Sequence, residues 1–339
     1  MKKIVSILVL LSLGASGWAA PLFTRTADGN WSALSQWKDN GSGKFAASSV
    51  LPGSEDNVVV NSNRKVTLDT DSSVALFQII NSASSAIVDV DGENTLTAEL
   101  IQVGLNSTGL GILNQTAGTI SSPKIWVGRL AGNPGTYNLS GGALDMNGSL
   151  NINSTGLMNV NGGTLNNSFN GAVRTISGAG TIKLSAGSIN LKGTLETDRV
   201  DLNGALFEVS GGTVNLGAQV RVGGKVPAEF RVVGHNAAIT FGALDQDVAT
   251  KGTFKFVFDT TGISPIQVTD SMKLSQAKIV VDGSAYTGNG GTFTLFSSAG
   301  LVSVADINNI TIIGFGSKTA AIVQDEANGK VQLVVTPSV

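Results

Sequence analysis

The chain has 339 residues, of which 43 are glycine, one is histidine and none is cysteine. The missing cysteines exclude disulfides, thiolate nucleophiles and cysteine-ligated metals, and a single histidine excludes a multi-histidine metal centre. A formal charge of −2 argues against nucleic-acid binding, which requires a basic surface. A hydrophobic content of 42% with only 14% charged residues argues against disorder. The composition predicts a folded protein with few side chains that could act in catalysis or bind a metal.

Residues 1–19 have the pattern of a secretory signal peptide. Lys2 and Lys3 precede the apolar run Ile4–Leu13, and small residues follow it. Gly17 and Ala19 place the expected cleavage after Ala19. The apolar run is too short to span a bilayer, which disfavours the alternative of a membrane anchor. We therefore expect an exported protein, extracellular or at the cell surface with the periplasm as the alternative, and without a membrane span after cleavage.

A short phrase recurs along the middle of the chain: in most copies a small residue, then glycine, then threonine, alanine or serine, then a branched aliphatic residue. Its copies are Ala117–Ile120, Gly141–Leu144, Gly162–Leu165, Ala179–Ile182, Ala186–Ile189, Lys192–Leu195, Asn203–Leu206 and Gly211–Val214. The glycines of the first four copies are separated by 24, 21 and 17 residues, and the later ones by 7, 6, 11 and 8. Repeats of about 20 residues that hold short apolar segments are typical of a β-solenoid. The shorter spacings leave the coil register after residue 180 open.

Short segments between these phrases alternate apolar and polar residues, as in Ser149–Asn153 and Leu157–Asn161. This period of two indicates strands with one face inward and one outward. Glycine and asparagine tolerate the positive φ that tight corners need. The pattern predicts an all-β, right-handed parallel β-helix over residues 61–224, with an antiparallel sandwich or barrel as the alternative.

The composition changes at both ends of the repeat. Trp31, Trp37 and Phe45 precede it, so residues 20–60 are interpreted as an N-terminal cap, which a solenoid needs to cover its open end. Aromatic residues return after about residue 225 in alternating runs such as Thr253–Phe258, joined by glycine turns. This pattern favours antiparallel hairpins, and residues 225–339 are therefore predicted to form a C-terminal antiparallel β-sandwich-like module.

The segments Leu113–Ile120, Trp126–Gly128 and Gly135–Leu144 resemble repeats of bacterial exported β-helix proteins. These are autotransporter-passenger-like proteins and surface proteins of the sorting-signal type. The stretches from Asn30 to Val58 and from Gly291 to Leu333 are similar to their first coil and their endings. The sequence departs from them in having neither a membrane barrel nor a C-terminal sorting segment. The resemblance implies an exported Gly-Asn-rich β-helix and leaves its anchoring open.

Polysaccharide lyases and hydrolases also use β-helix folds, and they need acids or a basic residue clustered on neighbouring coils. Between residues 138 and 190 the charged residues are Asp145, Arg174 and Lys183 alone, too few for such a cluster. The other acids that we considered are Asp69 with Asp71, Asp89 with Asp91 and Glu93, and Glu196 with Asp198 and Asp201. We interpret them as solvated acids and an Asp-Gly turn, and predict no catalytic residue, no metal site and no cofactor.

Three other side chains were considered as parts of a site. His235 follows a glycine in a turn, with no recognisable nucleophile near it in the sequence, so it is interpreted as a surface histidine rather than a catalytic base. Trp126 and Tyr137 would stack on a sugar ring if exposed, but packing between coils is the favoured interpretation.

These patterns predict a non-enzymatic exported β-solenoid with a structural, adhesive or extracellular-matrix role. Its expected partners are cell-surface or matrix polysaccharides or other surface proteins. The alternative is a carbohydrate-active β-helix protein, either a lyase or hydrolase or a glycan-binding module. A groove where two acids and a lysine or arginine converge would favour this alternative.

Overall fold

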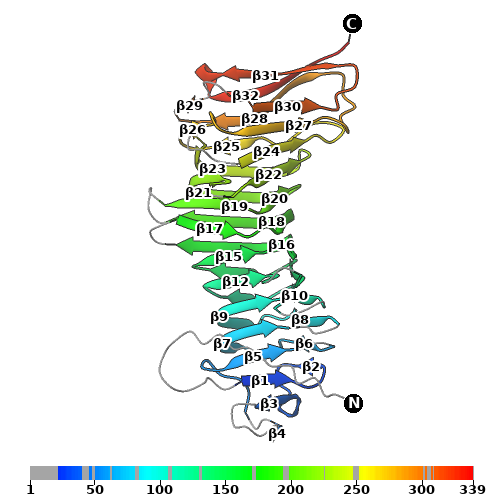
Figure 1. The fold of residues 1–339 in the computed structure, drawn as a ribbon, viewed down its shortest axis with the longest axis vertical. Helices are drawn as coiled ribbons and strands as arrows, with labels where there is room; N and C mark the ends of the chain where they lie inside the picture. The colour runs from blue at the N-terminus through cyan, green and yellow to red at the C-terminus, as the bar shows by residue number, and fades with distance from the viewer. Residues whose placement is uncertain are drawn as a thin grey trace.

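The computed structural model describes residues 22–39, 46–47, 50–61, 63–80, 84–105, 109–129, 132–169, 173–193, 198–224, 226–246, 252–300, 302–303, 307 and 309–338. The expected signal peptide, Phe45 and Glu196 lie outside these residues. The described chain stacks its strands coil upon coil into an elongated rod, with the earliest strands at one end and the latest at the other (Figure 1). It is a parallel β-solenoid, as the sequence predicts.

Three parallel ladders of strands run along the rod, and most coils contribute one strand to each. Ladder A contains β2 (Gly29–Asn30), β6 (Lys65–Thr67), β8 (Ala86–Val90), β10 (Gly111–Gln115), β13 (Gly135–Leu139), the first parts of β16 (Gly156–Phe169) and β18 (Thr181–Gly193), β20 (Leu206–Val209), β22 (Ala228–Val233), β24 (Gly252–Val257), β27 (Lys278–Asp282) and β30 (Asn309–Ile313).

Ladder B contains the first parts of β7 (Ser72–Ile79) and β9 (Thr95–Val103), β11 (Thr119–Ser121), β14 (Ala143–Met146), the second parts of β16 and β18, the first parts of β21 (Gly212–Val222) and β23 (Ala237–Asp245), β25 (Ile266–Val268) and the last part of β28 (Gly291–Ser298). Ladder C contains β1 (Leu22–Arg25), β5 (Asn57–Val60), the second parts of β7, β9, β21 and β23, β12 (Lys124–Val127), β15 (Ser149–Ile152), β17 (Val173–Ser177), β19 (Arg199–Asn203), β26 (Met272–Lys273) and β29 (Val302–Ser303).

The corner between ladders A and B explains the recurrent glycine phrase. Adding a Cβ to Gly141 would place it 2.0 Å from the carbonyl oxygen of Thr116 in the preceding coil. Gly142 has a φ of +68°, which residues with a Cβ rarely adopt. The equivalent corner glycines are Gly118, Gly142, Gly163, Gly187 and Gly212. They recur after 24, 21, 24 and 25 residues, so the coil register continues beyond residue 180.

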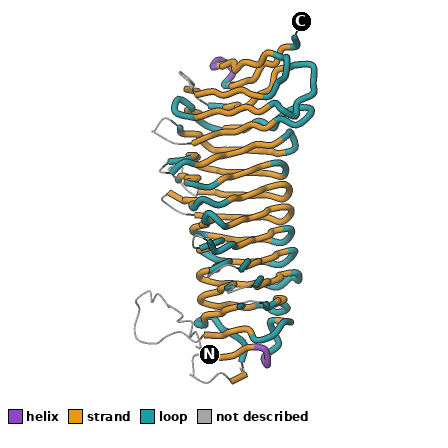
Figure 2. The backbone as a smooth tube through the Cα atoms, turned by 45° about the vertical axis from the view of Figure 1, so that its right-hand side comes forward, coloured by secondary structure: helices purple, strands orange, loops and turns teal. Residues whose placement is uncertain are grey.

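Figure 2 shows the coils stacked on one another along the rod. The core is a set of buried, inward-facing side chains between the ladders. In ladder A the same inward position is filled in successive coils by Val88, Leu113, Tyr137, Met158, Ile182, Phe207, Phe230, Phe254 and Ile279. All of them are buried. Phe207 and Phe230 lie with their rings nearly parallel and their centroids 5.2 Å apart. Aromatic residues thus replace aliphatic ones within one continuous core.

This stacking corrects the expected boundary at residue 225. The parallel ladders continue from β20 through β22, β24 and β27 to β30, so most of residues 225–313 belong to the solenoid. Among the described residues of this region, antiparallel pairing is confined to β28, β31 (Thr319–Asp325) and β32 (Lys330–Thr336). A period-two alternation is the same for a parallel coil and an antiparallel hairpin, so the pattern of residues 225–339 suggested hairpins where coils form.

At the other end, β1 pairs in parallel with β5 along one edge and antiparallel with β3 (Trp37–Asp39) along the other. β3 also pairs antiparallel with β4 (Ala46–Ala47), and the 3-10 helix η1 (Leu34–Gln36) precedes it. Trp31 and Trp37 are fully buried and meet edge to face at 4.9 Å. The second 3-10 helix, η2 (Glu326–Asn328), connects β31 to β32.

Candidate functional site

Outward-facing polar side chains form a row along ladder A, because equivalent positions of successive strands lie directly above one another. The row consists of Asp89, Asn114, Asn138, Asn159, Lys183, Glu208, Arg231 and Lys255. In its first half, the Nδ2 atoms of Asn114, Asn138 and Asn159 each donate a 2.8 Å hydrogen bond to the side-chain oxygen one coil earlier. Lys65 closes this end with a 2.9 Å ion pair to Asp89.

A second row runs along ladder B. The Nδ2 atoms of Asn166, Asn190 and Asn215 donate to Asp145, Asn166 and Asn190 at 2.9, 3.1 and 2.9 Å. Each amide therefore connects two coils while part of its surface stays accessible, since all three asparagines are partly exposed. Six asparagines of the repeat lie in these two rows. We call them the ladder A row and the ladder B row.

The second half of the ladder A row is charged. Arg231 donates from Nη1 to Glu208 of the preceding coil at 3.0 Å, and from Nε to Glu229 of its own strand at 2.6 Å. Lys183 lies 3.7 Å from Glu208 on the other side. Two carboxylates and two cations thus meet over three neighbouring coils.

A shallow groove of about 310 Å³ lies beside this charged cluster. Its floor consists of small residues, among them Gly180, Gly204 and Ala205, and Glu229 and Arg231 form part of its wall. Both acids already accept hydrogen bonds from Arg231, so a ligand that used them would have to compete with this guanidinium. The groove can hold a short polar chain, with carboxylate and guanidinium groups positioned to bond hydroxyls.

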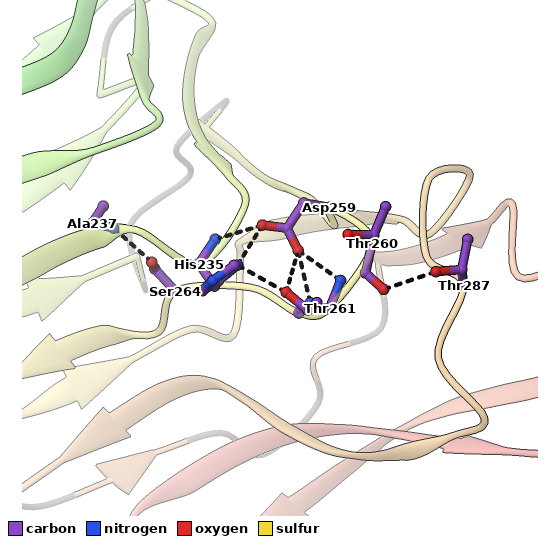
Figure 3. Close-up of polar contacts among 8 residues, drawn as sticks. His235, Ala237, Asp259, Thr260, Thr261, Ser264 and Thr287 are labelled. Atoms are coloured by element: carbon purple, nitrogen blue, oxygen red, sulfur yellow. Dashed lines mark hydrogen bonds and ion pairs between the residues drawn. The ribbon is translucent and has the colours of Figure 1, made fainter.

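His235 lies just beyond β22, at the corner that follows ladder A (Figure 3). Its Nδ1 lies 2.5 Å from Oδ2 of Asp259, one coil further on, and 3.0 Å from the hydroxyl of Thr261. In a nucleophilic triad the hydroxyl meets the ring nitrogen opposite the one that the acid orients. Here both groups meet the same nitrogen, so the geometry is that of a corner contact between two coils.

Asp259 is held as a carboxylate. Its partial burial opposes ionisation, but hydrogen bonds from the backbones of Thr261 and Gly262 and from the side chains of His235 and Thr261 outweigh it. The pKa of Asp259 therefore lies well below its usual range. The same carboxylate accepts a bond from the backbone amide of His235 at 3.2 Å, so it fixes both the ring and its turn.

Three of the acids singled out in the sequence, Asp69, Asp71 and Asp89, bond residues of a neighbouring coil. Asp69 accepts from the backbone amide of Ser32 at 2.9 Å, and Asp71 from that of Thr95 at 2.8 Å. Asp89 belongs to the ladder A row, and Asp201 forms a 2.7 Å ion pair with Arg199. Among the residues that the structure describes, no three His, Asp or Glu side chains gather closely enough to hold a metal ion.

The two aromatic candidates differ in their exposure. Tyr137 is fully buried and its hydroxyl donates to Gln115 at 2.6 Å, so it packs between coils and does not face a sugar. Trp126 is partly exposed on ladder C, with the guanidinium of Arg129 4.7 Å from its ring centroid. Packing is thus confirmed for Tyr137.

Sequence reasoning missed the charged cluster and the partner of His235. Glu208 and Arg231 are separated by 23 residues, and His235 and Asp259 by 24. Both separations equal one coil, so the corner spacing of 24, 21, 24 and 25 residues is the signal that would have paired them.

The fold defines the class of the protein as a parallel β-solenoid with polar side-chain rows. No family model, no curated protein and no solved structure matches this chain. Within the described ranges, no helix combines the length and the apolar character needed to cross a bilayer.

Proposed function

We propose that this chain is an exported, non-enzymatic β-solenoid that serves a structural or adhesive role at or outside the cell surface. The observation that carries the proposal is the pair of side-chain rows on ladders A and B. Their amides bond coil to coil along the outside of the rod, in addition to the backbone ladders. Such a surface holds its shape and repeats the same polar groups at a fixed spacing, which suits weak multivalent contact with polysaccharide or with other surface proteins.

Export is tested by expressing the full chain with a C-terminal tag in a bacterial host and fractionating the cells. We expect a shortened species outside the cytoplasm that begins at Ala20, because the N-terminal pattern of residues 1–19 is that of a signal peptide. The matched control is Leu8→Arg with Leu10→Arg, which interrupts the apolar run and keeps the chain in the cytoplasm. Full-length wild-type protein retained in the cytoplasm would contradict the proposal.

Adhesion is tested with the purified mature chain and a panel of insoluble polysaccharides. We expect binding without release of new reducing ends or unsaturated sugars. Binding should weaken in Asn166→Ala with Asn190→Ala, and stay unchanged in a control that alters an exposed residue away from the rows, Val50→Ala. Circular dichroism verifies that each variant keeps its β structure. Absence of binding to the whole panel and to intact cells would refute the adhesive role.

The groove beside Arg231 favours carbohydrate-active chemistry as a second candidate function. Glu229 and Arg231 line this groove, and Glu208 accepts a hydrogen bond from Arg231 beside it, so two acids and an arginine come together at its edge. A glycan cleaved by the mature chain, with the cleavage lost in both Glu208→Gln and Glu229→Gln but retained in Glu93→Gln, would establish the enzyme. Glu93 is suitable as the control because it lines a separate depression, beside the ladder A–B corner at Gly118 and Gly142.

A further inference from the structure

The last coil leaves strand edges open at the C-terminal end of the rod. Among the described strands, β30 pairs only with β27, and β31 pairs only with β32. Both lie at the upper end in Figure 1. Every earlier strand of ladder A from β6 onward has a partner on each side. An open strand edge presents unpaired backbone donors and acceptors, so it is a template for another strand.

These edges lack the features that usually prevent pairing. Strand edges are commonly protected by lysine, proline or a bulge, whereas β30 has no charged residue and β31 has only Asp325 at its end. Ile313 and Val323 are among the few large apolar side chains of the described chain that are strongly exposed, at 47% and 43%. Ile310, Ile312 and Ile322 are partly buried against the core beside them.

The sequence of β31 is suited to pairing with itself. The strand runs from Thr319 to Asp325, so an antiparallel pairing centred on Ile322 places every residue of the strand opposite one of a second copy. Ile322 then meets Ile322 of the other copy, and Ala321 meets Val323. Lys318 and Glu326, which flank the strand, are brought opposite each other, so the ends of the pairing carry complementary charge.

We propose that β31 is the interface of a homodimer in which two rods join at their C-terminal ends through antiparallel β31–β31 pairing. The sheet formed by β28, β32 and β31 then continues into the same three strands of the second copy. A contact of this kind is isologous and closes on itself, so it gives a dimer and not a fibre. The polar rows of the two rods would then lie on opposite sides of the junction, related by the two-fold axis of the dimer.

The proposal is tested by measuring the molar mass of the purified mature chain at concentrations from micromolar to near-millimolar. Sedimentation equilibrium, or light scattering after size exclusion, gives this mass. We expect the mass to reach twice that of the chain. Ala321→Lys with Val323→Lys places like charges directly opposite each other and should weaken the dimer about 100-fold. Both side chains are exposed, so the fold is retained. The control is Val50→Lys with Val226→Lys, two exposed apolar sites away from the junction.

Mixing tests the register itself. The double variant Ala321→Glu with Val323→Glu should also be monomeric alone, but an equimolar mixture with the lysine variant should form a heterodimer, because each lysine then faces a glutamate. A wild-type chain that stays monomeric throughout, lysine substitutions without effect, or a mixture that fails to associate would each overturn the proposal.

Discussion

The hydroxyl of Tyr137 donates a 2.6 Å hydrogen bond to Oε1 of Gln115, one coil earlier and inside the core. The amide of Gln115 is used as well, because its Nε2 donates to the carbonyl oxygens of Ala143 at 2.7 Å and Gly118 at 3.2 Å. A single buried glutamine thus connects its own coil to the next one. Burial also raises the pKa of the Tyr137 hydroxyl well above its usual value, so the tyrosine is protonated and can donate at neutral pH.

Tyr137→Phe should therefore destabilise the rod by about 1–3 kcal/mol, since Oε1 of Gln115 is left buried without this donor. The measurement is the urea midpoint followed by circular dichroism, which is suitable even where repeats unfold in more than one step. Tyr286→Phe is the matched control. Its hydroxyl bonds Gly290 in a partly buried turn, where water can replace it, so a smaller shift is expected. Equal shifts in the two variants would contradict the role of Gln115.

The ladder A row should behave as a coupled unit. Asn138 donates to Asn114 and accepts from Asn159. Asn138→Ala is therefore expected to cost about 0.5–2 kcal/mol, and a double-mutant cycle with Asn159→Ala should show a coupling of about 0.5 kcal/mol or more. Thr136→Ala on the same strand is the control, because the Thr136 side chain makes no hydrogen bond to the described residues. If the losses in free energy of unfolding of the two single variants simply added in the double variant, the asparagines of the row would not be energetically coupled.

The repeat could be read from the sequence because its cause is local. A corner glycine such as Gly142 is required by its own φ and by the backbone that passes beneath it, so the phrase marks each coil. The side chains that meet across coils could not be read in the same way. Coil length varies along ladder A beyond β6, from 21 residues between β13 and β16 to 31 between β27 and β30. The phrase also occurs at other corners, as at Gly204, so the phrase alone did not pair His235 with Asp259. The β28–β32 pairing is likewise a long-range contact that alternation does not encode.

The corner glycines offer a test that separates backbone strain from steric overlap. Gly142→Ala combines a φ of +68° with a Cβ that would lie 2.3 Å from the carbonyl oxygen of Gly118. Gly132→Ala has a φ of +90° but nothing within 4 Å of its Cβ. The Gly132 variant should lower the free energy of unfolding by about 1–2 kcal/mol, from backbone strain alone. The Gly142 variant should lower it clearly more. Both losses are measured from the shift in urea midpoint. If the two variants lost similar amounts of stability, the coils at the Gly142 corner could move apart to accommodate the Cβ without an energetic penalty.

The carboxylate of Asp259, at the corner between the coils of β22 and β24, should make stability depend on pH. Because the pKa of Asp259 is lower in the folded chain than in the unfolded chain, it stabilises the fold above the unfolded value, which is about 4. This stabilisation is lost as the pH falls through the acidic range towards the folded value. Asp259→Asn should therefore lower the urea midpoint at neutral pH, and the difference from wild type should shrink as the pH is lowered below about 4.

The control for this titration is Asp270→Asn, since Asp270 is an exposed acid in the turn between β25 and β26 of the same coil. Because this side chain is exposed, its substitution should change the urea midpoint at neutral pH less than Asp259→Asn does. His235→Gln adds a second readout, because it removes the ring that bonds Asp259 while the backbone donors of Thr261 and Gly262 remain. Part of the acid dependence should then persist, at a smaller amplitude than in wild type. The contrary outcome is a difference in urea midpoint between Asp259→Asn and wild type that stays constant from neutral to strongly acidic pH. That result would show that these bonds do not hold the carboxylate in its ionised form.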